Sequence, residues 1–69
     1  MLERLLAILD RIEPTKREVF VLYEMEGQSM VKVAETLGCP VRSAFSKLEA
    51  ARKEVSRAWQ RDELRGRRI

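Results

Sequence analysis

The stretch QSMVKVAETLGCPVRSAFSKLEAARKE, residues 28–54, decides the fold. Ser29 can accept hydrogen bonds from the free N–H groups of a helix that begins at residue 30. Gly38 stands where a left-handed residue commonly ends a helix, and Pro40 favours a new helix start directly after it. The spacing therefore predicts a short helix over 30–37, a tight turn and a second helix from residue 41. Two helices joined by so short a turn form a helix-turn-helix.

Apolar residues recur at helical spacing on both sides of this turn. Val33, Ala34 and Leu37 share one face of the shorter helix. The stripe of the longer helix consists of Val41, Ala44, Leu48, Ala51 and Val55. We expect Ala34 to lie where the two helices cross, because only a small side chain fits there.

The rest of the chain completes an all-α fold of four helices. An apolar stripe predicts a first helix over 2–12; its members are Leu2, Leu5, Leu6, Leu9 and Ile12. Thr15 and Glu18 have the spacing of a capping box and predict a central second helix that ends at Gly27. We expect the last helix to cover 41–65 and a frayed basic tail at about 64–69. Residues 1–69 then form a single helix-turn-helix domain with a long C-terminal recognition helix.

Composition restricts the class of protein. The chain has 69 residues, one cysteine and no histidine, so a zinc site of the Cys/His kind and histidine-based catalysis are excluded. It shows no nucleophile–base pair, phosphate loop or metal cluster, so we expect neither an enzyme nor a cofactor. The apolar run at 2–9 is too short and too charged to span a membrane, which favours a cytoplasmic protein.

Charge is divided unevenly along the chain. Residues 1–38 carry five basic and seven acidic side chains, net −2, whereas residues 39–69 carry nine basic and four acidic ones, net +5. The positive field thus lies on the second helix of the helix-turn-helix and its tail. This distribution favours a polyanionic partner, and the second helix of such a unit enters the major groove of DNA.

Helical geometry places five residues opposite the apolar stripe of the long helix: Arg42, Ser46, Glu49, Lys53 and Arg57. In a groove, Arg42 donates to guanine, Ser46 to almost any base, and Phe45 contacts a thymine methyl group. Phosphate contacts are expected from Lys47, Arg52, Lys53 and Arg57, and from Ser29 at the start of the preceding helix. The sequence leaves open whether Phe45 packs back against the preceding helices and whether Arg42 and Lys53 are only solvated surface.

The run REVFVLYEMEGQSMVKVAETLGCPV at 17–41, followed by SKLEAARK at 46–53, resembles region 4 of bacterial sigma factors, in particular the extracytoplasmic-function type. The resemblance covers about residues 10–58. It implies a module that recognises the minus-35 promoter element through its last helix and docks on the flap of the RNA polymerase β subunit. Carried over residue by residue, the base-facing positions are Arg42, Ser43, Phe45, Ser46 and Glu49. The backbone contacts are Lys47, Arg52 and Lys53.

Glu49 and Ala50 depart from the family pattern, which commonly has an aromatic residue or histidine followed by a basic residue there. An acidic side chain on a groove-facing surface repels phosphate unless it meets a cytosine amino group. The alternative function is therefore a protein-interaction module of the same fold. Such a module binds a polymerase subunit, an activator or an anti-sigma partner, and its promoter binding is weak or lost.

Overall fold

A computed structural model describes the backbone of residues 2–66 and the side chains of residues 2–64. The chain forms helices α1 (Leu2–Leu9), α2 (Pro14–Phe20), α3 (Met30–Leu37) and α4 (Val41–Gly66), and a π-helical segment, η1 (Val21–Met25), continues α2. Residues 2–66 contain no strand, so the all-α prediction is confirmed. α4 is helical through Gly66, and the part of the predicted frayed tail at 67–69 lies outside the described residues.

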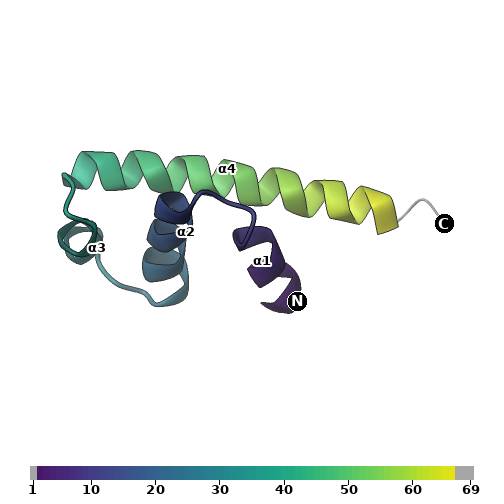
Figure 1. Cartoon of the computed structure of the whole chain (residues 1–69), viewed down its shortest axis with the longest axis horizontal. Coiled ribbons are helices and arrows are strands. Elements are labelled where there is room, and N and C mark those ends of the chain that lie inside the picture. Colours follow the sequence, from purple (N-terminus) through teal and green to yellow (C-terminus); the bar gives the residue numbers. More distant parts are fainter. Residues whose placement is uncertain (1, 67–69) are drawn as a thin grey trace.

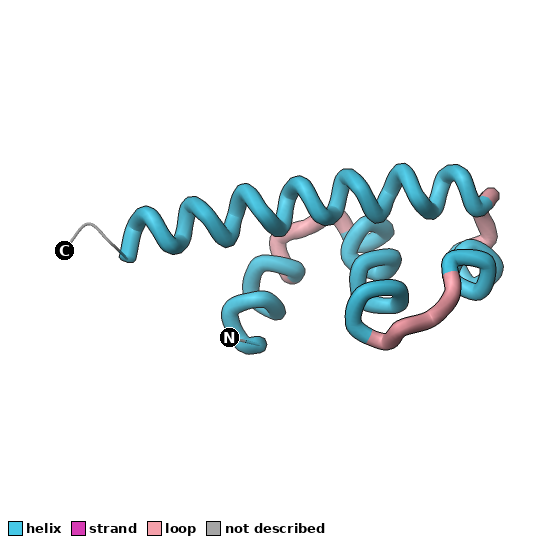
Figure 2. The backbone as a smooth tube through the Cα atoms, turned by 180° about the vertical axis from the view of Figure 1, so that it is seen from behind, coloured by secondary structure: helices cyan, strands magenta, loops and turns pink. Residues whose placement is uncertain are grey.

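The long helix α4 runs the length of the molecule, and the shorter helices pack along one side of it (Figure 1). α3 lies at the N-terminal end of α4, α2 follows, and α1 lies nearer the C-terminal end. The same row is seen from behind, and the last turns of α4 project beyond α1 in both views (Figure 2). The molecule is therefore elongated, with extents of 46 × 18 × 15 Å.

The core is divided into two clusters along α4. The helix-turn-helix cluster consists of Val19, Met30, Val33, Ala34, Ala44 and Leu48. The α1 cluster consists of Ile8, Leu9 and Ile12, against which Val55, Ala58 and Trp59 of α4 pack. Phe20 packs against both clusters and joins them. The central position expected for the second helix is thereby confirmed.

The second helix ends in a wide turn at a left-handed glycine. The N–H of Glu26 donates to the carbonyl of Val21 at 2.9 Å, the spacing of a π-helix, which the sequence did not reveal. The N–H of Gln28 donates to the carbonyl of Leu22 at 3.0 Å. Gly27 has a φ of 72°, a conformation that glycine adopts readily. The helical segment ends at Met25 with Glu26 as its C-terminal cap, so the predicted end at Gly27 was two residues too late; the left-handed glycine follows the cap.

α1 is shorter than predicted. The helix ends at Leu9, and the expected continuation to residue 12 was wrong. The N–H groups of Arg11 and Ile12 instead donate three residues back, to Ile8 and Leu9, both at 3.0 Å. This tighter turn still buries Ile12, which is 5% exposed. The apolar spacing was therefore a correct guide to burial but not to the helix end.

The start of α2 also differs from the capping box predicted at Thr15 and Glu18. The capping residue is Glu13, whose carboxylate accepts the N–H of Lys16 at 3.2 Å and the hydroxyl of Thr15 at 2.7 Å. Pro14 accounts for the difference, because proline suits the first helical position and favours extended backbone in the residue before it. Glu13 accordingly has a ψ of 134°.

Candidate nucleic-acid interface

The turn between α3 and α4 is held by backbone geometry. The Ser29 hydroxyl oxygen accepts the N–H of Lys32 at 3.2 Å and caps α3. Gly38 has φ 68° and ψ 36°, and the N–H of Cys39 donates to the carbonyl of Ala34 at 3.1 Å. Apart from the adjoining residues of the chain, no atom lies within 4 Å of where a Cβ would stand on Gly38, so the left-handed backbone, rather than space, requires glycine. The predicted cap, helix and turn are confirmed.

The inner side of α4 holds the helix against its neighbours. The N–H of Ala44 donates to the carbonyl of Pro40 at 3.1 Å, so α4 begins directly after the proline. Ala44, Leu48 and Ala51 are at most 2% exposed. Val41, the first residue of the apolar stripe, is 37% exposed, because the first turn of α4 lies at the end of the molecule (Figure 1). The buried stripe begins at Ala44.

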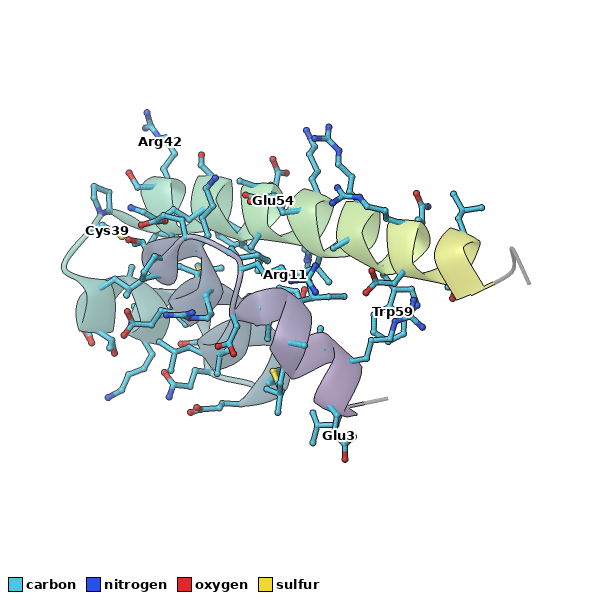
Figure 3. The ribbon with its side chains drawn as sticks, turned by 45° about the vertical axis from the view of Figure 1, so that its right-hand side comes forward. Glu3, Arg11, Cys39, Arg42, Glu54 and Trp59 are labelled. Atoms are coloured by element: carbon cyan, nitrogen blue, oxygen red, sulfur yellow. The ribbon has the colours of Figure 1, made fainter. Side chains whose placement is uncertain are left out.

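The outer side of α4 is open to solvent. Its exposed residues are Arg42, Ser46, Glu49, Lys53 and Arg57. Phe45 is 46% exposed, so its ring is available at this surface and is not enclosed by the preceding helices. Arg42 projects from the first turn of α4, away from the shorter helices (Figure 3). The start of α4 thus presents a guanidinium group, an aromatic ring and a hydroxyl close together.

The other predicted contact residues lie beside this outer side or on another helix. Helical geometry places Ser43 and Lys47, both half-buried, on one flank of α4 and Arg52 on the other. The Nε of Arg52 donates to the carboxylate of Glu24 in η1. This hydrogen bond raises the pKa of Arg52 and commits part of its charge to an internal partner. Ser29 is exposed, before α3.

The family model for sigma-70, region 4, matches residues 2–55, which include the turn and the outer residues of α4 as far as Lys53. The chain belongs to the sigma-70 region 4 family. Neither the curated proteins nor the solved structures gave a match to it. This region 4 domain is accordingly a DNA-binding, helix-turn-helix domain of transcription initiation that works with promoter DNA and RNA polymerase; the family is not one of enzymes.

Among the long-range contacts of the region 4 domain that the sequence did not reveal, two concern Arg52 and Trp59. One is the pair of Glu24 and Arg52. In the other, the Arg4 guanidinium lies 3.9 Å from the centroid of the Trp59 ring and donates to the Trp59 carbonyl at 2.7 Å. Trp59 also packs against the α1 cluster. The partners are 28 and 55 residues apart in sequence, so no local pattern reveals either pair.

The part of the chain that the structure describes was also compared with the features of membrane spans and of metal sites. None of the described helices combines the length and the apolar character needed to cross a membrane. Within residues 2–66, no three aspartate, glutamate or cysteine side chains gather as the ligands of a metal ion would.

Proposed function

We propose that this region 4 domain reads the minus-35 element of a promoter through the outer side of the first half of α4. The observation that carries the proposal is the contrast across that helix. Arg42, Phe45 and Ser46 are exposed, whereas Ala44 and Leu48, on the opposite side, are at most 2% exposed. A helix held in this way can enter the major groove, which is about 12 Å wide, without unfolding its support.

Each base-facing residue has a chemical role in this proposal. Arg42 donates both guanidinium N–H groups to a guanine, and Ser46 donates to or accepts from a neighbouring base. Phe45 contacts a thymine methyl group, and Ser43 adds a second hydroxyl at the edge of the surface. Glu49 accepts from a cytosine amino group and disfavours other bases at that step.

The backbone contacts are proposed from side chains that surround these residues. Lys47 and Lys53 meet phosphates on either side of the groove, with Arg57 as the outermost contact along α4 and Ser29 at the start of α3. Arg52 contributes less to DNA affinity than its charge implies, because its Nε already donates to the carboxylate of Glu24. Contacts of this kind raise affinity for all sequences alike.

Docking on RNA polymerase is proposed for exposed apolar side chains of α1 and η1. Leu2 and Leu6 of α1 are 57% and 46% exposed, and Met25 of η1 is 40% exposed. Exposed apolar side chains of this kind suit a protein partner, and we assign them to the flap of the β subunit. We place the protein in the cytoplasm, as part of a sigma factor of the extracytoplasmic-function type.

A second candidate function is a protein-interaction module with weak promoter binding. Two observations favour it: Glu49 is exposed on the outer side of α4, and Arg52 is paired with Glu24. Both reduce the positive charge that a duplex would meet. An anti-sigma protein or an activator is the partner expected in that case.

A salt series separates the two functions. Duplexes selected by the protein from a randomised 20-base-pair library are compared with an unselected duplex by fluorescence anisotropy. We expect Arg42→Ala to lower the preference for the selected duplex by about 1–3 kcal/mol. Lys53→Ala lowers affinity for both duplexes and reduces the salt slope by about 0.9.

Gln60→Ala is the matched control, because Gln60 is exposed on α4 and uncharged. A salt slope near zero for the unaltered protein rejects promoter reading and supports the interaction module. Unchanged binding by both the Arg42 and the Lys53 variants shows that the groove-facing surface is assigned wrongly.

A further inference from the structure

A small hollow lies between the end of α1 and the second half of α4, away from the proposed groove-facing residues. Its apolar floor is formed by Ile8, Ile12 and Ala58, and its volume is about 160 Å³. Ligand pockets for free small molecules are commonly about 300–1,000 Å³. A hollow of this size suits one side chain of a larger partner and is too small for a free nucleotide.

Three arginines line this hollow: Arg11, after α1, and Arg57 and Arg61 on α4. All three are exposed. Arg57 and Arg61 are four residues apart in one helix, so they lie on the same side of α4, where like charges destabilise the helix slightly. Figure 3 shows Arg11 between α1 and α4 and Arg42 at the far end of α4. The hollow is therefore a positive site separate from Arg42.

The nearby carboxylates are engaged elsewhere. Glu54 also lines the hollow, but its Oε2 accepts from the Nζ of Lys16 at 2.8 Å, a bond that raises the pKa of Lys16. Asp10, the neighbour of Arg11, lies 3.8 Å from Arg17. Among the ion pairs of the described residues, none includes Arg11, Arg57 or Arg61. The guanidinium groups thus remain available to an external anion.

We propose that this hollow is a docking site for an acidic segment of a partner protein, which inserts one aspartate or glutamate side chain between the arginines. Guanidinium groups bind carboxylates through paired hydrogen bonds. The apolar floor accepts the methylene groups of such a side chain, which a phosphate lacks. Arg61 follows Val41 by 20 residues, so it lies about 30 Å along α4 from the end that enters the groove.

The site shares Arg57, the outermost proposed phosphate contact, with the duplex surface, but it uses none of the base-facing residues. Arg57, Ala58 and Arg61 lie beyond the segment that the family model matches, which ends at residue 55. The hollow therefore combines residues of α1 and the turn after it, which the family model matches, with residues of α4 that follow the matched segment.

The test uses the whole chain and a fluorescein-labelled 15-residue peptide made of Glu, Asp and Leu. A second peptide, with Gln and Asn in place of the acids, measures the contribution of charge. We expect the double variant Arg11→Gln/Arg61→Gln to bind the acidic peptide about tenfold more weakly, the loss expected for two exposed charged contacts. The methyl NMR signals of Ile8 and Ile12 shift when the acidic peptide is added to the unaltered protein.

Arg42→Gln is the matched control, since it removes one positive charge from the other end of α4. It leaves peptide binding within twofold and weakens binding of the selected duplex. The proposal is overturned if the double variant keeps its peptide affinity or if the neutral peptide binds equally well. It is also overturned if the double variant loses duplex affinity as strongly as peptide affinity, which would make the site a phosphate contact. Failure of Arg42→Gln to affect the duplex contradicts only the groove-facing role of Arg42 and leaves the hollow untouched.

Discussion

The first and second halves of α4 are supported in different ways. In the first half, Ala44, Leu48 and Ala51 are almost completely buried. In the second half, the residues that pack on α1 are Val55, Ala58 and Trp59, and all are only partly buried. Small residues at a helix crossing permit close approach and tight packing. The comparison indicates that the half proposed to enter the groove is packed more tightly, whereas the half beside α1 leaves more of its packing residues exposed.

The largest effect is expected when the tightly packed half loses a core side chain. Leu48→Ala removes a side chain that is 2% exposed and should lower the free energy of unfolding by about 2–5 kcal/mol. Val55→Ala, at a partly buried position of the second half, is the control and should cost about 1 kcal/mol. Urea unfolding, followed by far-ultraviolet circular dichroism, measures both.

The same experiment asks whether the two halves unfold together. Phe20 packs against both clusters, so we expect the fluorescence of Trp59 and the circular dichroism signal to change at the same urea concentration. Separate transitions would mean that the helix-turn-helix cluster and the α1 cluster unfold independently. The two halves of α4 would then belong to two small folding units.

The crossing of α3 and α4 can be tested by adding volume. Ala34 is 4% exposed in the helix-turn-helix cluster, so Ala34→Leu should overpack the crossing and destabilise the domain by about 1–3 kcal/mol. Ala7→Leu makes the same change at an exposed position of α1 and should leave the melting temperature nearly unchanged. Equal melting temperatures for the two variants would contradict the close approach inferred at Ala34.

A smaller effect is expected in the second half, where Arg4 lies over Trp59. Arg4→Met keeps an unbranched apolar stem but removes the cation from the ring, which should cost about 0.5–1 kcal/mol. The fluorescence maximum of Trp59 should shift, while affinity for the selected duplex stays the same. Arg11→Met, at another arginine near α1, is the control. A comparable shift of the Trp59 fluorescence in this variant would show that the shift does not report the contact between Arg4 and Trp59.

The helix-turn-helix half could be predicted from the sequence because its signals are local. Ser29, Gly38 and Pro40 each act within a few residues, and the bounds of α3 agree with the prediction. Near Pro14 the same kind of reasoning failed, because a glutamate cap competed with the Thr15 signal. The π-helical turn at Val21–Met25 has no local pattern that distinguishes it from an α-helical end.

The sequence could predict which face of α4 forms the candidate site, but not which of its side chains form ion pairs. Helical periodicity correctly separated exposed Arg42, Ser46 and Glu49 from buried Ala44 and Leu48. That Arg52 is held by Glu24 depends on how η1 lies against α4, which is a tertiary property. The arginine-lined hollow is likewise formed only when the end of α1 is brought beside α4.

The smallest effect is expected at the N-terminal cap of α2, the helix whose Phe20 packs against both core clusters. The hydrogen bond from Thr15 lowers the pKa of Glu13 below its ordinary value of 4.5. A carboxyl group with a lowered pKa stabilises the fold above pH 4.5, and this contribution is lost as the pH falls through the lower, folded-state pKa. Glu13→Gln keeps an oxygen that accepts the N–H of Lys16 but removes the charge. The variant should melt slightly below the unaltered protein at pH 7, and the difference should disappear in acid. Glu18→Gln, an equal charge change at an exposed position of α2, is the control. A melting difference between Glu13→Gln and the unaltered protein that persists unchanged into acid would contradict the role assigned to the Glu13 carboxylate.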